Sequence, residues 1–162
     1  MTLLAALWKK LGLSKNIQLK IMGFVQDKFL VGVTGIIFND KNKVLLCKHT
    51  YRGNSWSLPG GYLKGKEHPR EGLEREIEEE TGFIVSVDER VKIRTDRETA
   101  RLDITYAGVF IGGEFKPSKE VSRARFFAFE KLPILRKDQL IFIEMVLRKR
   151  KNKLEVKHNF FV

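Results

Sequence analysis

The sequence predicts an α/β fold in which helices cover both faces of a sheet. Segments with the composition of strands alternate with two longer segments, 69–81 and 137–150, that are predicted to be helical. The run Phe29–Phe38 is apolar almost throughout, which is typical of a strand covered on both sides. The chain has 162 residues, 43% of them hydrophobic, which is the length and composition of about one folded domain.

The first half of the chain is predicted to hold one short helix and several strands. In order, these are a helix over 3–13 and strands over 17–24, 29–38, 44–47 and 56–58. The helix is indicated by leucines and Trp8 that fall on one side. The turn residues 39–42 separate two strands that we expect to pair with each other. Pro59-Gly60-Gly61 ends the last of these strands.

The second half begins and ends with a predicted helix. In order, its elements are a helix over 69–81, strands over 83–95, 101–111 and 122–129, and an amphipathic helix over 137–150. Gly82 is a typical helix-ending residue, and Gly112-Gly113 is interpreted as a turn. The remaining residues, 151–162, form a polar tail that ends in Phe160-Phe161-Val162.

Composition excludes several classes of protein. No apolar run reaches the ~18 residues of a membrane span, so no integral membrane segment is expected. The single cysteine, Cys47, excludes an internal disulfide framework and a multi-cysteine zinc site. The first residues do not have the charge order of a signal peptide, so we expect a cytoplasmic protein. Nothing in the sequence indicates an oligomeric state.

The positive charge is concentrated at the two ends of the chain. The net charge is +11, of which residues 1–28 carry +4 and residues 148–157 carry +5. We interpret the basic ends first as a solvated, solubilising surface. A patch that binds RNA or an anionic membrane surface stays open as the alternative.

Three carboxylates share one side of the predicted helix over 69–81. At ~100° per residue, Glu76, Glu79 and Glu80 fall within an arc of about 100°. Two further glutamates, Glu74 and Glu78, are predicted to point away from this arc, towards solvent. An ordinary solvated, glutamate-rich helix explains the pattern, and so does a bound divalent cation.

The position of the apolar residues is a reason to consider the cation. Leu73 and Ile77 border the carboxylate arc, so the like charges lie beside the core. Like charges at these spacings cost roughly 0.2–0.5 kcal/mol per pair, and a hard cation such as Mg²⁺ binds carboxylate oxygens. Glu67, in the preceding loop, can fold back as another acidic neighbour, and the Gly60-Gly61 turn exposes carbonyls that can complete the ligand set.

The same segment carries a longer pattern, G-x5-E-x7-R-E-U-x-E-E-x-G-U, where U is a bulky apolar residue. It resembles the Nudix box, the signature of the Nudix hydrolase family. All fixed identities are present: Gly61, Glu67, Arg75, Glu76, Glu79, Glu80 and Gly82. One departure is Phe83, where an aliphatic residue is more usual. The resemblance covers roughly residues 28–150, and leaves out an N-terminal extension, 1–27, and the basic tail, 151–162.

The resemblance implies a Nudix-type α/β/α sandwich with a mixed sheet between helices. It also implies a hydrolase that uses Mg²⁺ or Mn²⁺ to break the pyrophosphate link of a small-molecule nucleoside diphosphate derivative. By similarity, the metal ligands are Glu76, Glu79, Glu80, the Gly60 carbonyl and Glu67. Arg75 then orients a neighbouring carboxylate and the helix.

Three residues outside the box are further candidates. In some family members a glutamate six residues before an aromatic of the late strand joins the metal site or acts as the base. Glu120 stands six residues before Phe126, so it is a candidate base; a solvated loop position explains it as well. Tyr51 and Arg52, in the loop before the box, are candidate substrate contacts.

The substrate is the least determined part of the prediction. Family members specific for ADP-ribose commonly carry a proline some fifteen residues past the box, whereas this chain has none between Pro69 and Pro117. Nucleoside triphosphates, oxidised ones included, are therefore the expected substrates. Two alternatives stay open: an RNA 5′-end pyrophosphohydrolase that uses the basic ends, and a binding module that senses a nucleotide without cleaving it.

Overall fold

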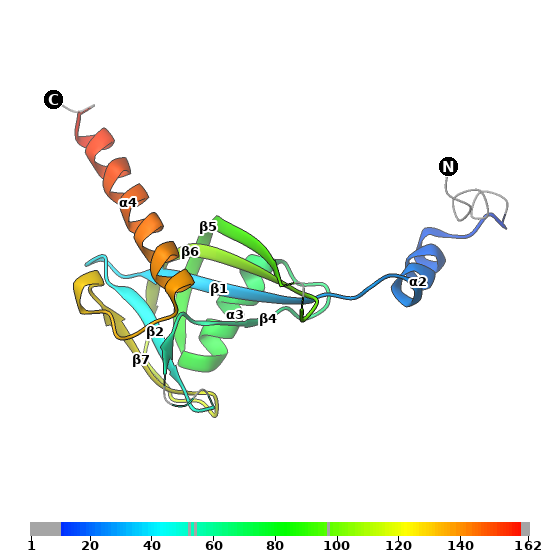
Figure 1. The fold of residues 1–162 in the computed structure, drawn as a ribbon, viewed down its shortest axis with the longest axis horizontal. Coiled ribbons are helices and arrows are strands. Elements are labelled where there is room, and N and C mark those ends of the chain that lie inside the picture. The colour runs from blue at the N-terminus through cyan, green and yellow to red at the C-terminus, as the bar shows by residue number, and fades with distance from the viewer. Residues whose placement is uncertain (1–10, 52, 54, 97, 160–162) are drawn as a thin grey trace.

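The computed structural model describes residues 11–51, 53, 55–96 and 98–159, with only the backbone of residues 153–159. The described chain folds around one mixed sheet with helices on both faces, as the sequence predicts (Figure 1). In chain order the elements are α2 (Lys15–Val25), β1 (Leu30–Phe38), β2 (Val44–His49), β3 (Trp56–Ser57), β4 (Gly60–Tyr62), α3 (Pro69–Thr81), β5 (Phe83–Asp96), β6 (Arg101–Gly113), β7 (Val121–Phe127), a 3-10 turn (Phe129–Lys131) and α4 (Lys137–Asn159).

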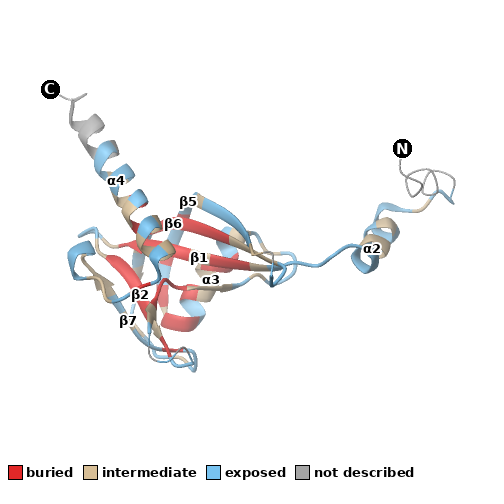
Figure 2. Cartoon of the chain, in the orientation of Figure 1, coloured by how far each residue is buried: buried red, intermediate tan, exposed pale blue. Residues whose placement is uncertain are grey.

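Strand β1 is the centre of the sheet. It pairs in parallel with β6 along its whole length, and antiparallel with β4 at Gly32–Thr34. β6 continues the sheet into β5, and β2 carries β3 and β7 at the other side. The expected pairing of the first two long strands is limited to one position, Phe38 opposite Val44. The near-continuous apolar run of β1 is buried on both faces, as its composition predicts (Figure 2).

Each face of β1 supplies a separate core. Val33 and Ile37 pack with Leu73 and Ile77 of α3 on one face. Ile36 and Phe38 pack with Ile143 of α4, among others, on the opposite face. The period of two along β1 therefore fixes α3 and α4 on opposite sides of the sheet. Helix α3, which carries the carboxylate arc, is thus held against β1, and β1 lines the cavity described below.

The prediction of a strand at 17–24 is wrong, because these residues belong to helix α2. Ile17, Ile21, Phe24 and Val25 are spaced i, i+4, i+7 and i+8, which is a helical pattern. The alternation of Ile17, Leu19 and Ile21 imitates a strand over so short a run. Figure 1 shows α2 apart from the sheet. The helix predicted over 3–13 falls largely on residues 1–10, which lie outside the described residues.

The ends of other elements also differ from the prediction. Helix α4 continues to Asn159, nine residues beyond its predicted end, because no glycine or proline interrupts the basic run. In Figure 1 this part of α4 projects beyond the sheet. Gly112-Gly113 is not a turn but the end of β6, paired with β5. Strand β7 ends at Phe127, two residues early, and the 3-10 turn follows. No helix within the described residues is both long and apolar enough to cross a membrane.

Candidate active site

Helix α3 has well-formed ends, and these fix which residues face the sheet. His68 precedes the first helical residue, Pro69, and its Nδ1 accepts a hydrogen bond from the Arg70 N–H at 3.3 Å. Glu71 returns the contact by accepting the His68 N–H at 3.2 Å, which completes a capping box. Gly82 ends the helix at φ 73°, in the left-handed region. The predicted bounds of this helix are confirmed, and His68 caps it, a role that sequence reasoning missed.

The carboxylate arc lies at the edge of the core, as the helical wheel predicts. Leu73 and Ile77 are fully buried, and Glu80 is only 7% exposed. The side chain of Glu76 is 18% exposed, whereas that of Glu79 is 52% exposed. The three glutamates therefore differ in depth, with Glu80 innermost.

One of the two glutamates expected to point towards solvent does not. Oε1 of Glu74 accepts the backbone N–H of Val87 at 2.7 Å. This bond joins α3 to β5 at a position where the helical wheel alone shows no partner. Glu78 is exposed, as predicted.

Arg75 holds the acidic side chains together. Its guanidinium donates two hydrogen bonds to Glu67, at 3.0 and 2.8 Å, one to Glu76 at 2.7 Å and one to Glu79 at 3.0 Å. A fifth contact reaches the Tyr62 carbonyl at 3.3 Å. Such a fork of charge-assisted bonds fixes three carboxylates relative to the β4 backbone. These contacts are compatible with the orienting role that the Nudix resemblance implies for Arg75.

The same contacts shift proton affinities. The hydrogen bonds from Arg75 and the Lys64 N–H lower the pKa of Glu67 from 4.5 to about 2. The pKa of Glu79 is also lowered, first by its bond from the Lys64 ammonium and then by Arg75. In return, Glu67 above all raises the pKa of Arg75. Both glutamates are therefore ionised at neutral pH.

Two glycines let the helix carboxylates approach β4. A Cβ on Gly60 would lie 2.1 Å from the Val33 carbonyl oxygen, and Gly60 has φ 155°. A Cβ on Gly61 would lie 2.3 Å from Oε2 of Glu76. Side chains at these positions would collide with β1 and with Glu76, respectively. The glycine pair is therefore a steric requirement of the close packing between β1, β4 and α3.

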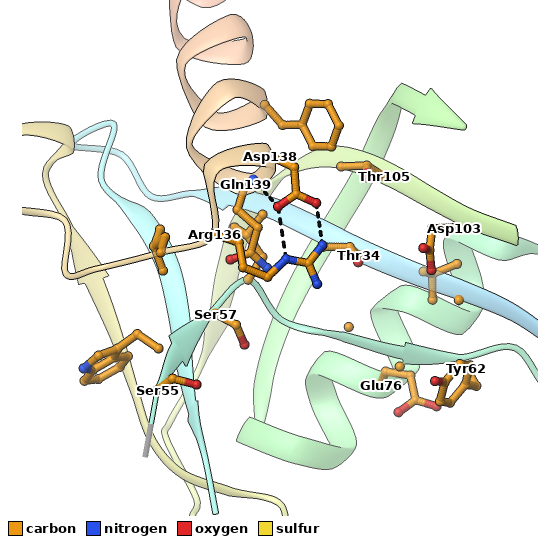
Figure 3. A pocket seen from close by; sticks show the side chains of 18 of the residues that line it. Thr34, Ser55, Ser57, Tyr62, Glu76, Asp103, Thr105, Arg136, Asp138 and Gln139 are labelled. Atoms are coloured by element: carbon orange, nitrogen blue, oxygen red, sulfur yellow. Dashed lines mark hydrogen bonds and ion pairs between the residues drawn. The ribbon is translucent and has the colours of Figure 1, made fainter. Parts of the chain in front are cut away.

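A cavity of about 720 Å³ opens beside these elements, and several predicted site residues line it. They are Tyr51, Gly60, Glu76, Glu80 and Glu120. Figure 3 shows this cavity, with Glu76 of α3 on one side and the start of α4 on the other. Glu67, Arg75 and Glu79 lie behind this wall and do not line the cavity. Arg52 lies outside the described residues.

The loop that carries Glu120 is tied to the end of β2. The Thr50 N–H donates to the Glu120 carbonyl at 2.9 Å, and the Thr50 hydroxyl donates to the Lys119 carbonyl at 2.8 Å. The side chain of Glu120 is left exposed at the cavity. Residues some 40 positions apart in sequence, Glu120 and Glu80, thus border the same space.

The far wall of the cavity is a charged network that sequence reasoning missed. Arg94 of β5 contacts Asp103 of β6 at 3.6 Å and Asp138 of α4 at 3.2 Å. Arg101 pairs with Asp103 at 2.9 Å, and Arg136 pairs with Asp138 and lowers its pKa. The sequence signal that could have predicted this network is the alternation of polar residues along β5 and β6, because alternate residues of a strand lie on the same face of the sheet.

Two polar side chains in the cavity wall have atoms with no hydrogen-bond partner among the described residues. They are Oγ of Ser57, a residue only 8% exposed, and Oε1 of Gln139. Both residues line the cavity, and Figure 3 shows them with the Arg136–Asp138 pair. Buried polar atoms are nearly always satisfied, so these two atoms are suited to a ligand's polar groups.

The donor chemistry of this wall fits a hard divalent cation. Glu76 and Glu80 present carboxylate oxygens to the cavity, next to the Gly60 backbone. Within the described residues, no three ligating side chains are gathered around one point. The reason is visible for Glu76 and Glu79, whose carboxylates are turned to Arg75. Oxygen donors of this kind fit Mg²⁺ or Mn²⁺.

Comparisons with known proteins concern the family and the fold of the chain. The model of the NUDIX domain matches residues 28–146. An ADP-ribose pyrophosphatase of Methanocaldococcus jannaschii is 35% identical over 125 residues, 73% of each chain. A MutT-like protein of Streptomyces ambofaciens is 41% identical over 59 residues, 36% of this chain and 38% of that protein. The crystal structure of a NUDIX hydrolase from Nitrosomonas europaea superposes with a TM-score of 0.70 at 23% identity, covering 78% of this chain and 74% of that one.

Proposed function

The chain belongs to the Nudix family, and from that premise we propose that Glu76, Glu80 and Glu120 hydrolyse a nucleoside diphosphate derivative in the cavity that they line. Hydrolysis of the pyrophosphate link in such compounds is the activity of the family, and its members generally need a divalent metal ion. The observation that carries the proposal is that glutamates from α3 and from the β6–β7 loop border one cavity.

The charge of the lining explains why a cation is needed. Five acidic and four basic side chains line the cavity: Glu76, Glu80, Asp103, Glu120 and Asp138, with Lys92, Arg94, Arg101 and Arg136. The acidic excess lies at the end formed by α3, where a diphosphate has to reach the attacking water. An anionic substrate is repelled there unless a divalent cation neutralises the carboxylates.

The proposed roles follow from position. Glu76 and Glu80, with the Gly60 carbonyl, would hold Mg²⁺ or Mn²⁺, which polarises phosphate oxygens and lowers the pKa of the attacking water. Glu79 is more exposed and would join as an outer ligand. Glu120 would accept the proton of that water, because it faces the cavity from the opposite loop.

Arg75 and Glu67 would act from behind the cavity wall. Arg75 is bonded to both Glu67 and Glu76, so it positions the carboxylate that faces the cavity. Glu67 contributes charge and orientation to Arg75 and makes no contact with the cavity. Tyr51, which lines the cavity and is 59% exposed, would contact the substrate, and Arg52 stays a candidate contact from the sequence alone.

For the substrate we place nucleoside diphosphate sugars of the ADP-ribose type first. The similarity to an ADP-ribose pyrophosphatase extends over 125 residues, whereas that to a MutT-like protein spans 59. The far wall also favours a sugar, since Asp103, Asp138 and Ser57 offer acceptors to hydroxyl groups. Nucleoside triphosphates are the second candidate, supported by the missing proline between residues 69 and 117.

A substrate panel separates these candidates. ADP-ribose, a uridine diphosphate sugar, ATP, 8-oxo-dGTP and 5′-triphosphate RNA would be assayed with Mg²⁺, with Mn²⁺ and with EDTA. Water added across the pyrophosphate link of ADP-ribose yields AMP and ribose 5-phosphate, and triphosphates yield a monophosphate and pyrophosphate. A preference for ADP-ribose of about tenfold or more in kcat/KM supports the first candidate, and the reverse preference supports the second. Selective turnover of RNA would instead indicate the 5′-end enzyme.

One result of the same panel would contradict the proposed enzymatic activity. If the chain binds a panel nucleotide tightly but cleaves none with either metal, it is a nucleotide-sensing module. Glu80→Gln is the matched control for catalysis, because it removes one negative charge and keeps the shape of the side chain. Equal turnover by wild type and Glu80→Gln would show that the reaction does not need the Glu80 carboxylate.

A further inference from the structure

Helix α2 presents an apolar face that no other described element covers. None of its residues is buried, and the exposed fractions are 47% for Ile17, 90% for Phe24 and 62% for Val25. At ~100° per residue these three and Ile21 fall within an arc of about 100°. Figure 2 shows α2 apart from the sheet and without buried residues. A helix with one apolar side stays in water only at a cost in free energy.

The opposite side of α2 is basic but not wholly polar, because Leu19, which is 61% exposed, lies between Lys15 and Lys20 on the wheel. Lys15 and Lys20 belong to the helix and Lys28 follows it, against one acidic residue, Asp27, in the described residues 11–30. On the wheel Lys15 and Lys20 stand beyond the two edges of the apolar arc. Long lysine side chains at such edges reach past the apolar face while their ammonium groups stay hydrated. The sequence before the described residues adds Trp8, Lys9 and Lys10, so residues 1–28 carry +4.

We propose that α2 binds the surface of an anionic lipid bilayer, with Phe24, Ile17 and Val25 among the acyl chains and the lysines at the phosphate level. An amphipathic helix with a basic polar face and an aromatic on its apolar face is suited to this position. Its eleven residues span about 16 Å, half of the ~30 Å hydrocarbon core, so it lies in the surface plane.

The same observations disfavour the two other partners of a basic amphipathic segment. RNA would take the lysines and could stack a base on Phe24, but it would leave the aliphatic Ile17 and Val25 in water. A second copy of the chain would cover the apolar face, but it brings the same positive charge to the contact. Anionic lipid complements both the charge and the apolar face.

The attachment would hold the reaction cavity near the membrane. Four residues, 26–29, connect α2 to β1, a reach of roughly 14 Å when extended. Gly32 and Thr34 of β1 line the cavity. The inference does not depend on which nucleotide is cleaved, and none of the α2 residues lines the cavity.

The test is vesicle co-sedimentation of the full chain. Phosphatidylcholine vesicles are compared with vesicles that also contain phosphatidylglycerol, at low and high salt. Wild type should sediment with the anionic vesicles and be released by salt, which screens the lysines. Phe24→Glu and Lys20→Glu should each lower the partition coefficient by about tenfold or more. Ile141→Glu is the control, since Ile141 is an aliphatic on α4 that is 61% exposed.

Other outcomes would overturn the proposal. All three variants should keep the wild-type turnover of a soluble substrate, which shows that they are folded. Equal sedimentation with neutral and anionic vesicles, or an equal loss in Ile141→Glu, contradicts a specific α2–lipid contact. RNA binding that Lys20→Glu abolishes, without any vesicle binding, assigns the segment to RNA. A dimer in sedimentation equilibrium that Phe24→Glu dissociates, again without vesicle binding, assigns it to a second copy.

Discussion

The most direct test of the site is the replacement of Gly61 by alanine. The added Cβ would lie 2.3 Å from Oε2 of Glu76, whereas ordinary contact begins at 3.4 Å. The backbone is not in the left-handed region at Gly61, so the strand itself accepts alanine. The Glu76 carboxylate is the end of a flexible side chain, so it is the group that moves. It must shift by roughly 1 Å, away from β4 and out of its place beside the cavity, a displacement that can cost about 10²-fold in rate.

We therefore expect Gly61→Ala to lower kcat/KM by about 10²-fold while the melting temperature changes by only a few degrees. Alanine in place of glycine in a strand otherwise stabilises by roughly 0.5–1 kcal/mol, which offsets part of the displacement. Gly65→Ala is the matched control, because Gly65 lies in the following loop and its Cβ would meet nothing within 4 Å. Steady-state kinetics on the panel substrate and thermal melts check both. Turnover of Gly61→Ala within threefold of Gly65→Ala would show that the reaction does not need Glu76 against β4.

Three further predictions concern the base, the metal and acid. Glu120→Gln should lower kcat by about 10²–10⁴-fold with little change in melting temperature. Glu130→Gln, in the exposed 3-10 turn, is the control and should keep the wild-type kcat. Equal kcat values for the two variants would assign the role of base to a glutamate of α3. Mg²⁺ or Mn²⁺ at 100 times its Kd should stabilise the fold by about 2.7 kcal/mol, measured by thermal melts. If the metal raises the melting temperature of Glu80→Gln as much as that of wild type, the cation binds away from Glu80. In EDTA, the Glu67–Arg75 pair should stabilise the protein fully above about pH 4.5 and lose this contribution as the pH falls towards 2, because the unfolded state then binds more protons. Glu67→Gln should flatten this part of the plot of melting temperature against pH. An unchanged plot would contradict a stabilising Glu67–Arg75 pair.

The parts of the fold that the sequence predicts are those determined by neighbours along the chain. Pro69 and Gly82 set the ends of α3, because proline suits a first turn and glycine the left-handed residue after a last one. The carboxylate arc follows from spacing on this one helix, so Glu76 and Glu80 could be placed together without any tertiary information. The strands β5 and β6 were likewise predicted within two residues of their observed ends.

The parts that the sequence does not predict depend on contacts between distant residues. Arg94 and Asp138 are 44 positions apart, and they meet only because the end of β5 and the start of α4 lie at the same cavity. Residues 17–24 were misassigned because their apolar spacing fits both the helical and the strand period, and no strand among the described residues pairs with them. Glu74 was placed in solvent because the wheel gives direction but not the strand backbone that its carboxylate meets.

The arrangement around Arg75 explains how a helix with an acidic arc can be folded before any cation binds. Its guanidinium bonds to Glu67, Glu76 and Glu79, so the repulsion within the arc is replaced by attraction. If Glu76 holds a divalent cation as proposed, the cation would compete with Arg75 for Glu76, while the two bonds from Arg75 to Glu67 need not break. Glu67 would then keep Arg75 beside the arc. Because Arg75 bonds separately to Glu67 and to Glu76, Glu67 has a structural role within the Nudix-box pattern although it does not line the cavity.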